Sequence, residues 1–223
     1  MSLRLIQSTV VVAAHRFNPS IVRDHWLIQH GIVGTADEIE PGYVITDVVV
    51  QIAVREFALV VTPDQVQFAP RVEAELQQSL IEERVGAIVR TLPHTPYKGL
   101  GLNFNWHVLP ENASIESLTR RLFSATNSPL SNEYQSADSR FGGYFSRTFL
   151  GFRMKLEAKP ILVRYADAEI EHDVLQLAFN FHLELRLGDE AKVDLMLEAF
   201  KRWNEVRDEA SRIAHLVSEA DVQ

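Results

Sequence analysis

The same order of elements occurs twice along this chain, and this repetition constrains the fold more than any single motif does. Residues 1–91 predict a strand, a short helix, about three antiparallel strands and a longer helix, and residues 92–223 predict that order again. The halves share this pattern rather than residue identity, so a chance likeness of two α+β stretches stays open beside true duplication. We expect an α+β fold with an antiparallel sheet, helices on one face of it, and two pseudo-repeats in one continuous domain.

The composition is that of a globular protein and excludes several kinds of chemistry. Hydrophobic residues make up 46% of the chain, and the formal net charge of -8 disfavours non-specific attraction to nucleic acid or anionic membranes. Because there is no cysteine, disulfides, thiolate catalysis and cysteine-ligated zinc are excluded. The first residues show no signal-peptide pattern and the apolar runs are too short for a membrane span, so we expect a cytoplasmic protein.

Alternating and helical patterns locate the elements of the first half. Asn18 can cap a helix that begins at Pro19, and Gly31 suits the end of that helix. The pair Pro63-Asp64 predicts the turn of a hairpin. The predicted set is a strand over 3–15, a short helix over 19–31, strands over 43–54, 57–62 and 66–69, and a helix over 73–91.

The second half begins with a strand over 97–109, in which apolar and polar residues alternate cleanly from Leu102 onward. It continues with a helix from Asn112 or Ser114 to about Phe123, strands near 144–157, 160–169 and 173–187, and one long helix over 189–218. The intervening segment 124–143 is rich in Ser, Asn, Asp and Gly. A connection of this length is usually disordered or functional, and the functional interpretation is a flap over a site, with Arg140, Phe141 and Tyr144 as its contact residues.

Two resemblances accompany these patterns. Tandem units of strand, helix, several antiparallel strands and helix resemble the duplicated fold of the TATA-binding protein and its structural relatives, which implies nucleic-acid binding through the sheet. That resemblance is one of element order, and no contact residue is carried over. Separately, Leu59-Val60-Val61-Thr62-Pro63-Asp64 and Leu92-Pro93-His94-Thr95-Pro96-Tyr97-Lys98-Gly99-Leu100-Gly101-Leu102-Asn103-Phe104 resemble segments of uncharacterised bacterial proteins without an assigned activity. Neither resemblance supplies a function.

No catalytic or cofactor signature stands beside this architecture. Gly99-Leu100-Gly101 lacks the third glycine and the following helix of a dinucleotide fingerprint, and there is no Walker sequence, no G-x-S-x-G elbow and no H-E-x-x-H. His25 and His30 lie five positions apart on the predicted helix, so they cannot bind one metal from the same face. We predict no cofactor and no metal site.

The face of the sheet that points away from the helices is the main candidate binding surface. Strand alternation places three rows of polar residues on it: Asn103, Asn105 and His107; Arg147, Arg153 and Lys155; and Gln176, Asn180, His182, Glu184 and Arg186. The predicted helices hold most of the acidic charge, so this face is locally basic and rich in amide and imidazole groups. It can receive a small anionic ligand, a peptide or a nucleic acid, or it is polar simply because it meets water.

The last helix suggests an association with a second copy. Met196, Trp203, Ala210 and Val217 recur every seven residues, and Val206 and Ile213 belong to the companion row. Packing on the chain's own sheet explains such a stripe, and so does a homodimer in which exposed Trp203 and Ile213 act as anchors. The predicted interface residues are therefore Met196, Trp203, Val206, Ala210, Ile213 and Val217.

The leading hypothesis is a non-enzymatic binding or interaction protein that uses the free face of its sheet. One alternative is an enzyme with a dispersed site, in which His107 or His182 acts as general base beside Asn103, Asn105 and Arg153. The other is nucleic-acid binding through the sheet. The ligand itself, the pathway and the oligomeric state lie beyond the sequence.

Overall fold

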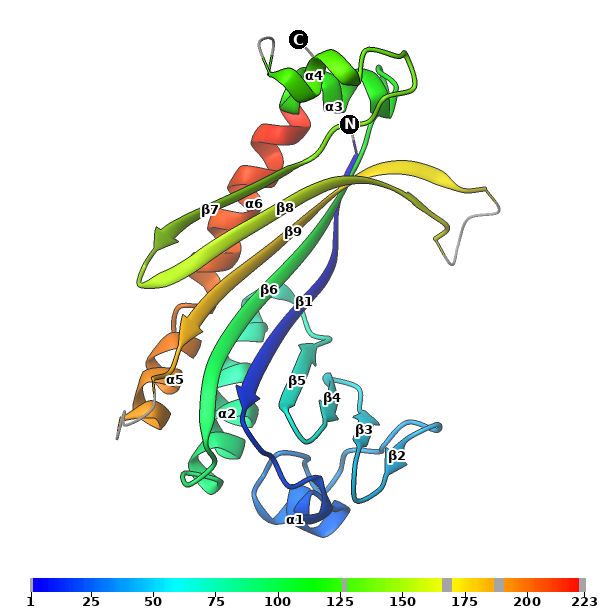
Figure 1. Ribbon diagram of the computed structural model, residues 1–223. Helices are drawn as coiled ribbons and strands as arrows, with labels where there is room; N and C mark the ends of the chain where they lie inside the picture. Colours follow the sequence, from blue (N-terminus) through cyan, green and yellow to red (C-terminus); the bar gives the residue numbers. More distant parts are fainter. Residues whose placement is uncertain (1, 126–127, 166–169, 187–190, 221–223) are drawn as a thin grey trace. The chain divides into compact units, whose positions relative to one another are not determined.

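A computed structural model describes residues 2–125, 128–165, 170–186 and 191–220. The chain has an α+β fold built on an open antiparallel sheet of nine strands in the order β2-β3-β4-β5-β1-β6-β9-β8-β7 (Figure 1). The expected fold class is confirmed. Each predicted repeat contributes four neighbouring strands in an equivalent order, β3-β4-β5-β1 for the first and β7-β8-β9-β6 for the second. Duplication itself stays a prediction.

The elements follow the doubled order closely. Those of the first half are β1 (Ser2–Ala14), the 3₁₀ helix η1 (Pro19–Ile21), α1 (Asp24–Gln29), β2 (Val44–Ile45), β3 (Val50–Ala53), β4 (Phe57–Val61), β5 (Gln65–Pro70) and α2 (Ala74–Thr91). Those of the second half are β6 (Tyr97–Leu109), α3 (Ile115–Phe123), α4 (Pro129–Glu133), β7 (Gly143–Phe149), β8 (Phe152–Val163), β9 (His172–Glu184), α5 (Lys192–Phe200) and α6 (Trp203–Glu219). None of the described helices has the length and apolar character that a membrane crossing requires.

The chain forms two compact units, and each takes segments from both predicted repeats. Unit 1 comprises the described residues within 1–7, 104–180 and 207–223, and unit 2 comprises those within 8–103 and 181–206. The long strands β1, β6 and β9 and the helix α6 each contribute residues to both units. The units are described separately below.

The core of unit 2 forms where α2 and α5 supply apolar side chains to β3, β4, β5 and the adjoining parts of β1, β6 and β9. The predicted hairpin turns between β4 and β5, and its ladder runs from Phe57↔Pro70 to Val61↔Val66. Phe57 and Phe68 stack with ring centroids 4.8 Å apart. Along α2, Ile81, Val85 and Val89 are fully buried, as helical spacing requires of one face.

The predicted strand over 43–54 is interrupted by a turn. The Thr46 hydroxyl accepts hydrogen bonds from the amides of Val48 (3.3 Å) and Val49 (3.0 Å), and the Thr46 amide donates to the Val49 carbonyl at 2.9 Å. This side-chain turn competes with the extended conformation, so the strand divides into β2 and β3.

The predicted strands over 144–157 and 160–169 are wrong in their boundaries, because the hairpin of unit 1 turns earlier. Leu150 (φ 48) and Gly151 (φ 85) both adopt the left-handed conformation of a two-residue turn between β7 and β8. The ladder runs from Gly143↔Ala158 to Phe149↔Phe152. Pro160 therefore lies within β8 but beyond the end of the β7 ladder, where its missing amide removes no bond to β7. Two predicted strands end at residues 169 and 187, and the predicted last helix begins at residue 189. These three positions lie outside the described residues.

The predicted long helix is two helices, and most of its apolar stripe is internal. The helix is interrupted by a turn at Lys201 and Arg202. At the start of α6, the amide of Asn204 donates a hydrogen bond to the Gln78 side chain of α2 at 3.3 Å. Met196, Trp203, Val206 and Ala210 are completely buried. The expectation that Trp203 is an exposed anchor is therefore wrong, because its ring packs in the core of unit 2 and its Nε1 donates to Gln77 Oε1 at 3.3 Å. Association of two chains stays a prediction.

Replacing Trp203 with alanine is expected to lower the free energy of unfolding by about 3–5 kcal/mol, because the substitution leaves a large cavity and deprives Gln77 of a partner. The matched control is Leu195→Ala on α5, at a position 41% exposed, which is expected to cost less than about 1 kcal/mol. Urea unfolding measures both values. Equal losses in the two variants would contradict the packing described for Trp203.

Candidate functional site

Unit 1 contains an apolar groove between the β7–β8–β9 part of the sheet and α6. Its volume is about 620 Å³, within the range of ligand-binding pockets in proteins. Phe123 at the end of α3 and Phe145 of β7 form one wall, with ring centroids 6.2 Å apart. The other lining residues are Tyr144, Ser146, Arg147, Met154, Leu156, Ala158, Leu177, Ile213 and Val217. The last two belong to the predicted interface, and they are half-buried along the groove.

Among the described residues that line the groove, Arg147 alone is charged, and it belongs to a small charge network. Arg147 donates to Glu209 of α6. Arg212 donates to the same carboxylate through Nε at 2.9 Å and Nη2 at 2.8 Å. The pKa of Glu209 is lowered, first by the Arg212 hydrogen bonds and then by the positive charge of both arginines, although burial opposes this effect. Two guanidinium groups share one carboxylate, so the network carries a net positive charge.

The register of β7 on β8 corrects the predicted row of Arg147, Arg153 and Lys155. Arg147 is paired with Met154, whereas Thr148 is paired with Arg153 and Ser146 with Lys155. Paired residues of an antiparallel ladder share a face, so Arg147 points to α6 while Arg153 and Lys155 point to the opposite face. The predicted row fails because the boundary between the two strands was placed eight or more residues too late.

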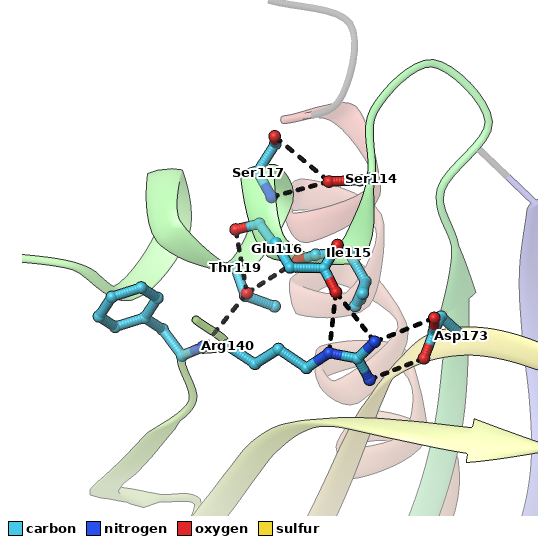
Figure 2. A network of polar contacts seen from close by, with 8 residues as sticks. Ser114, Ile115, Glu116, Ser117, Thr119, Arg140 and Asp173 are labelled. Carbon is cyan, nitrogen blue, oxygen red and sulfur yellow. Dashed lines mark hydrogen bonds and ion pairs between the residues drawn. The ribbon is translucent and has the colours of Figure 1, made fainter. Parts of the chain in front are cut away.

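Within the described part of segment 124–143, Arg140 and Phe141 pack on α3 and the start of β9. Arg140 donates through Nε to Glu116 at 2.9 Å and through its two terminal nitrogens to Asp173 at 2.8 and 3.1 Å (Figure 2). The amide of Phe141 donates to the buried Thr119 hydroxyl at 3.2 Å, and the Arg120 guanidinium lies 5.1 Å from the centre of the Phe141 ring. The hydrogen bonds to Asp173 raise the pKa of Arg140 further.

This packing fixes the places of the residues predicted to act in a flap, although the flap itself stays a prediction. Adjacent residues of a strand point to opposite faces. Asp173 binds Arg140, whereas His172 lies beside Tyr165 with ring centroids 6.0 Å apart. Arg140 thus lies on the face opposite the His172–Tyr165 contact. Of the predicted contact residues, Arg140 and Phe141 hold the segment in place and Tyr144 lines the groove.

A second polar cluster surrounds His107 in unit 1. His107 is only 6% exposed, and its Nδ1 lies 2.9 Å from the Tyr165 hydroxyl. The guanidinium of exposed Arg4 lies 4.8 Å from the centre of the Tyr165 ring. Burial lowers the pKa of His107, because a desolvated imidazolium is unfavourable. The imidazole is therefore neutral near pH 7, but a role as general base stays a prediction.

The remaining predicted site residues divide between the units. In unit 2, the Asn103 amide donates to the Thr9 hydroxyl at 3.4 Å, and His182 packs over Gly99, where an added Cβ would lie 2.9 Å from its Cε1. In unit 1, Asn180 is half-buried. Also in unit 1, Oδ1 of Asn105 is buried without a hydrogen-bond partner among the described residues. Within the same residues no three His, Asp or Glu side chains are grouped so that they could hold a metal ion.

Sequence reasoning missed several residues that complete these clusters. Tyr165 follows the end of β8, and Arg4 lies on the exposed part of β1, so neither belongs to a predicted polar row. Glu209 and Arg212 are ordinary charges of a helix surface until the register of β7 places Arg147 beside them. For Arg147 the signal in the sequence was its polar-facing position within the predicted strand over 144–157.

Arg140→Gln is expected to loosen segment 134–142, because one guanidinium bonds both α3 and β9. The expected loss of unfolding free energy is about 1 kcal/mol, since the pairs are partly solvent-screened. Hydrogen exchange of the Phe141 amide should accelerate. Arg164→Gln is the control, because Arg164 and Glu171 are exposed and 3.6 Å apart. Unchanged exchange at Phe141 would contradict the bridging role.

Acidification is expected to destabilise the chain in part through His107. Its pKa in the folded state lies below the unfolded value of 6.5, so the unfolded state alone binds the proton as the pH falls through this range. The stability that His107 contributes is complete above pH 6.5, and it declines as the pH falls toward the pKa of His107 in the folded state. Urea unfolding between about pH 7.5 and 5.5 should show a smaller decline in His107→Gln than in the unmodified chain, since one proton accounts for at most about 1.4 kcal/mol per pH unit. Identical declines would reject this assignment.

Comparisons with models of protein families, with curated proteins and with solved structures found no match to this chain. No activity, ligand or partner is thereby transferred from another protein. The groove, the outer strand β7 and the charges around them are the features from which a function can be inferred.

Proposed function

We propose that the chain is a non-enzymatic interaction protein that binds an extended peptide segment of a partner by adding it as a strand to the outer edge of β7. The observation that carries this proposal is the position of the apolar groove beside an edge strand. β7 is the last strand in the sheet order and also contributes four of the groove's lining residues, Tyr144, Phe145, Ser146 and Arg147.

The edge of β7 has the properties that strand addition requires. All seven residues from Gly143 to Phe149 are paired regularly with β8, so the strand is straight enough to continue a ladder on its other side. The opposite edge strand, β2, has only two residues and offers little ladder. An edge strand presents backbone N–H and C=O groups that bind another extended chain. An edge of this length without proline is usually shielded in proteins unless pairing is its role.

The groove explains how such a segment gains affinity and specificity. In an added strand, alternate side chains point to the same face, and the face that β7 shares with α6 is apolar at Phe145, Met154 and Leu156. Tyr144 and Phe145 are 65% and 49% exposed, so apolar area is available for burial on binding. A peptide therefore suits this site better than a nucleic acid, which has no backbone amide to continue the ladder.

Strand addition is testable with fluorescent peptides of about ten residues in which valine alternates with serine. Two N-methylated forms carry methyl groups on alternate amides, so that only one form can still bond β7. We expect anisotropy to show binding for the unmodified peptide and for one methylated form. Equal binding of both methylated forms would reject strand addition.

The groove's part is tested with Ile213→Trp, which fills the space that alternate peptide side chains would occupy. Peptide affinity is expected to fall about tenfold or more. Leu216→Trp is the matched control on the same helix, because Leu216 is 55% exposed and does not line the groove. Thermal unfolding verifies that both variants fold. If both bind the peptide like the unmodified chain, the groove is not the binding surface.

A further inference from the structure

The hairpin of β7 and β8 is strongly cationic in an otherwise acidic chain. Between residues 143 and 163 it carries Arg147, Arg153, Lys155 and Lys159 against the single carboxylate of Glu157. The whole chain has a formal net charge of -8. Glu157 is already bound by Lys159 at 3.2 Å. A concentration of one sign of charge at the edge of a sheet favours partners of the opposite sign.

On the face turned away from α6, two of these cations lie within reach of an added strand. Lys155 is paired with Ser146 and Arg153 with Thr148. An added strand would lie two strand spacings from β8, about 10 Å. The short side chains of Ser146 and Thr148 leave that distance open, and an extended Lys or Arg can cover it together with a Glu. Within the described parts of the chain, neither Arg153 nor Lys155 forms an ion pair.

On the groove face the charge has the same sign. Arg147 and Arg212 share the carboxylate of Glu209, which leaves one positive charge in excess at the groove. The remaining lining of the groove is uncharged. An added strand therefore meets an apolar surface with one cation on this face, and on the other face two cations that have no ion pair with any described residue.

We infer that the partner segment is acidic and alternates apolar with acidic residues, a conclusion that rests on the proposed strand addition at β7. Its apolar side chains enter the groove, and its carboxylates meet Arg153 and Lys155 on the opposite face. A second copy of this chain is a poorer occupant, because pairing two β7 edges would bring two cationic hairpins together.

The test compares three labelled peptides of about ten residues in which valine alternates with glutamate, glutamine or lysine. The glutamate peptide is expected to bind about tenfold more tightly than the glutamine peptide at about 0.05 M salt, and the lysine peptide more weakly than both. The advantage of glutamate should be lost in the double variant Arg153→Gln, Lys155→Gln. It should persist in Arg164→Gln, Lys201→Gln, which removes two exposed cations outside this hairpin.

Each outcome bears on a separate step. If all three peptides bind equally and the double variant changes nothing, the inferred recognition of acidic residues is wrong, whereas the proposed strand addition is not contradicted. If no peptide binds, the proposed function fails with it. If the glutamate advantage persists without Arg153 and Lys155, these residues do not read the carboxylates. Hydrogen exchange of the β7 amides that slows as the concentration of the free chain rises would show that a second copy occupies the edge, and would overturn the inference.

Discussion

The register of β7 on β8 is the constraint on which the chemistry of unit 1 depends. It is set at one end by the left-handed turn at Leu150 and Gly151. At the other end, a Cβ on Gly142 would lie 2.5 Å from the carbonyl oxygen of Ala158, so the backbones approach there only because this residue is glycine. A slip of one residue would exchange the two faces. Arg147 would leave Glu209, and Arg153 and Lys155 would point at α6.

Elements with a strong local pattern could be predicted from the sequence. The strand over 97–109 matches β6 residue for residue, and the helix over 73–91 begins one residue before α2. The turn between β7 and β8 could not be predicted in this way, because Leu150 adopts a positive φ that leucine rarely has and the pair Leu-Gly is a weak turn signal. The predicted boundary at residues 158–159 stands just before Pro160, which lies beyond the end of the β7 ladder and is therefore compatible with β8.

The candidate site was less predictable than the fold, because its residues meet through tertiary contacts. Alternation along one strand identified the polar position of His107. It could not show that the Tyr165 hydroxyl contacts His107, or that Arg4 lies over the Tyr165 ring. The heptad stripe of the last helix was read correctly as apolar. Its position did not reveal that Trp203 is internal while Ile213 and Val217 line a groove. The composition of segment 124–143 suggests mobility, whereas Arg140 forms two charged contacts that composition does not reveal.

The Arg140 network also bears on the cost of binding at β7. Phe123, which forms a wall of the groove, ends the helix that carries Glu116 and Thr119, and β7 begins two residues after Phe141, at Gly143. The contacts of Arg140 (Figure 2) and of Phe141 therefore fix both the helix that presents Phe123 and the entry to β7. An ordered groove avoids the loss of conformational entropy that a mobile one would suffer on binding. The polar network on α3 thus supports an apolar surface that it does not itself line, so under the proposed function the cost of ordering falls mainly on the bound segment.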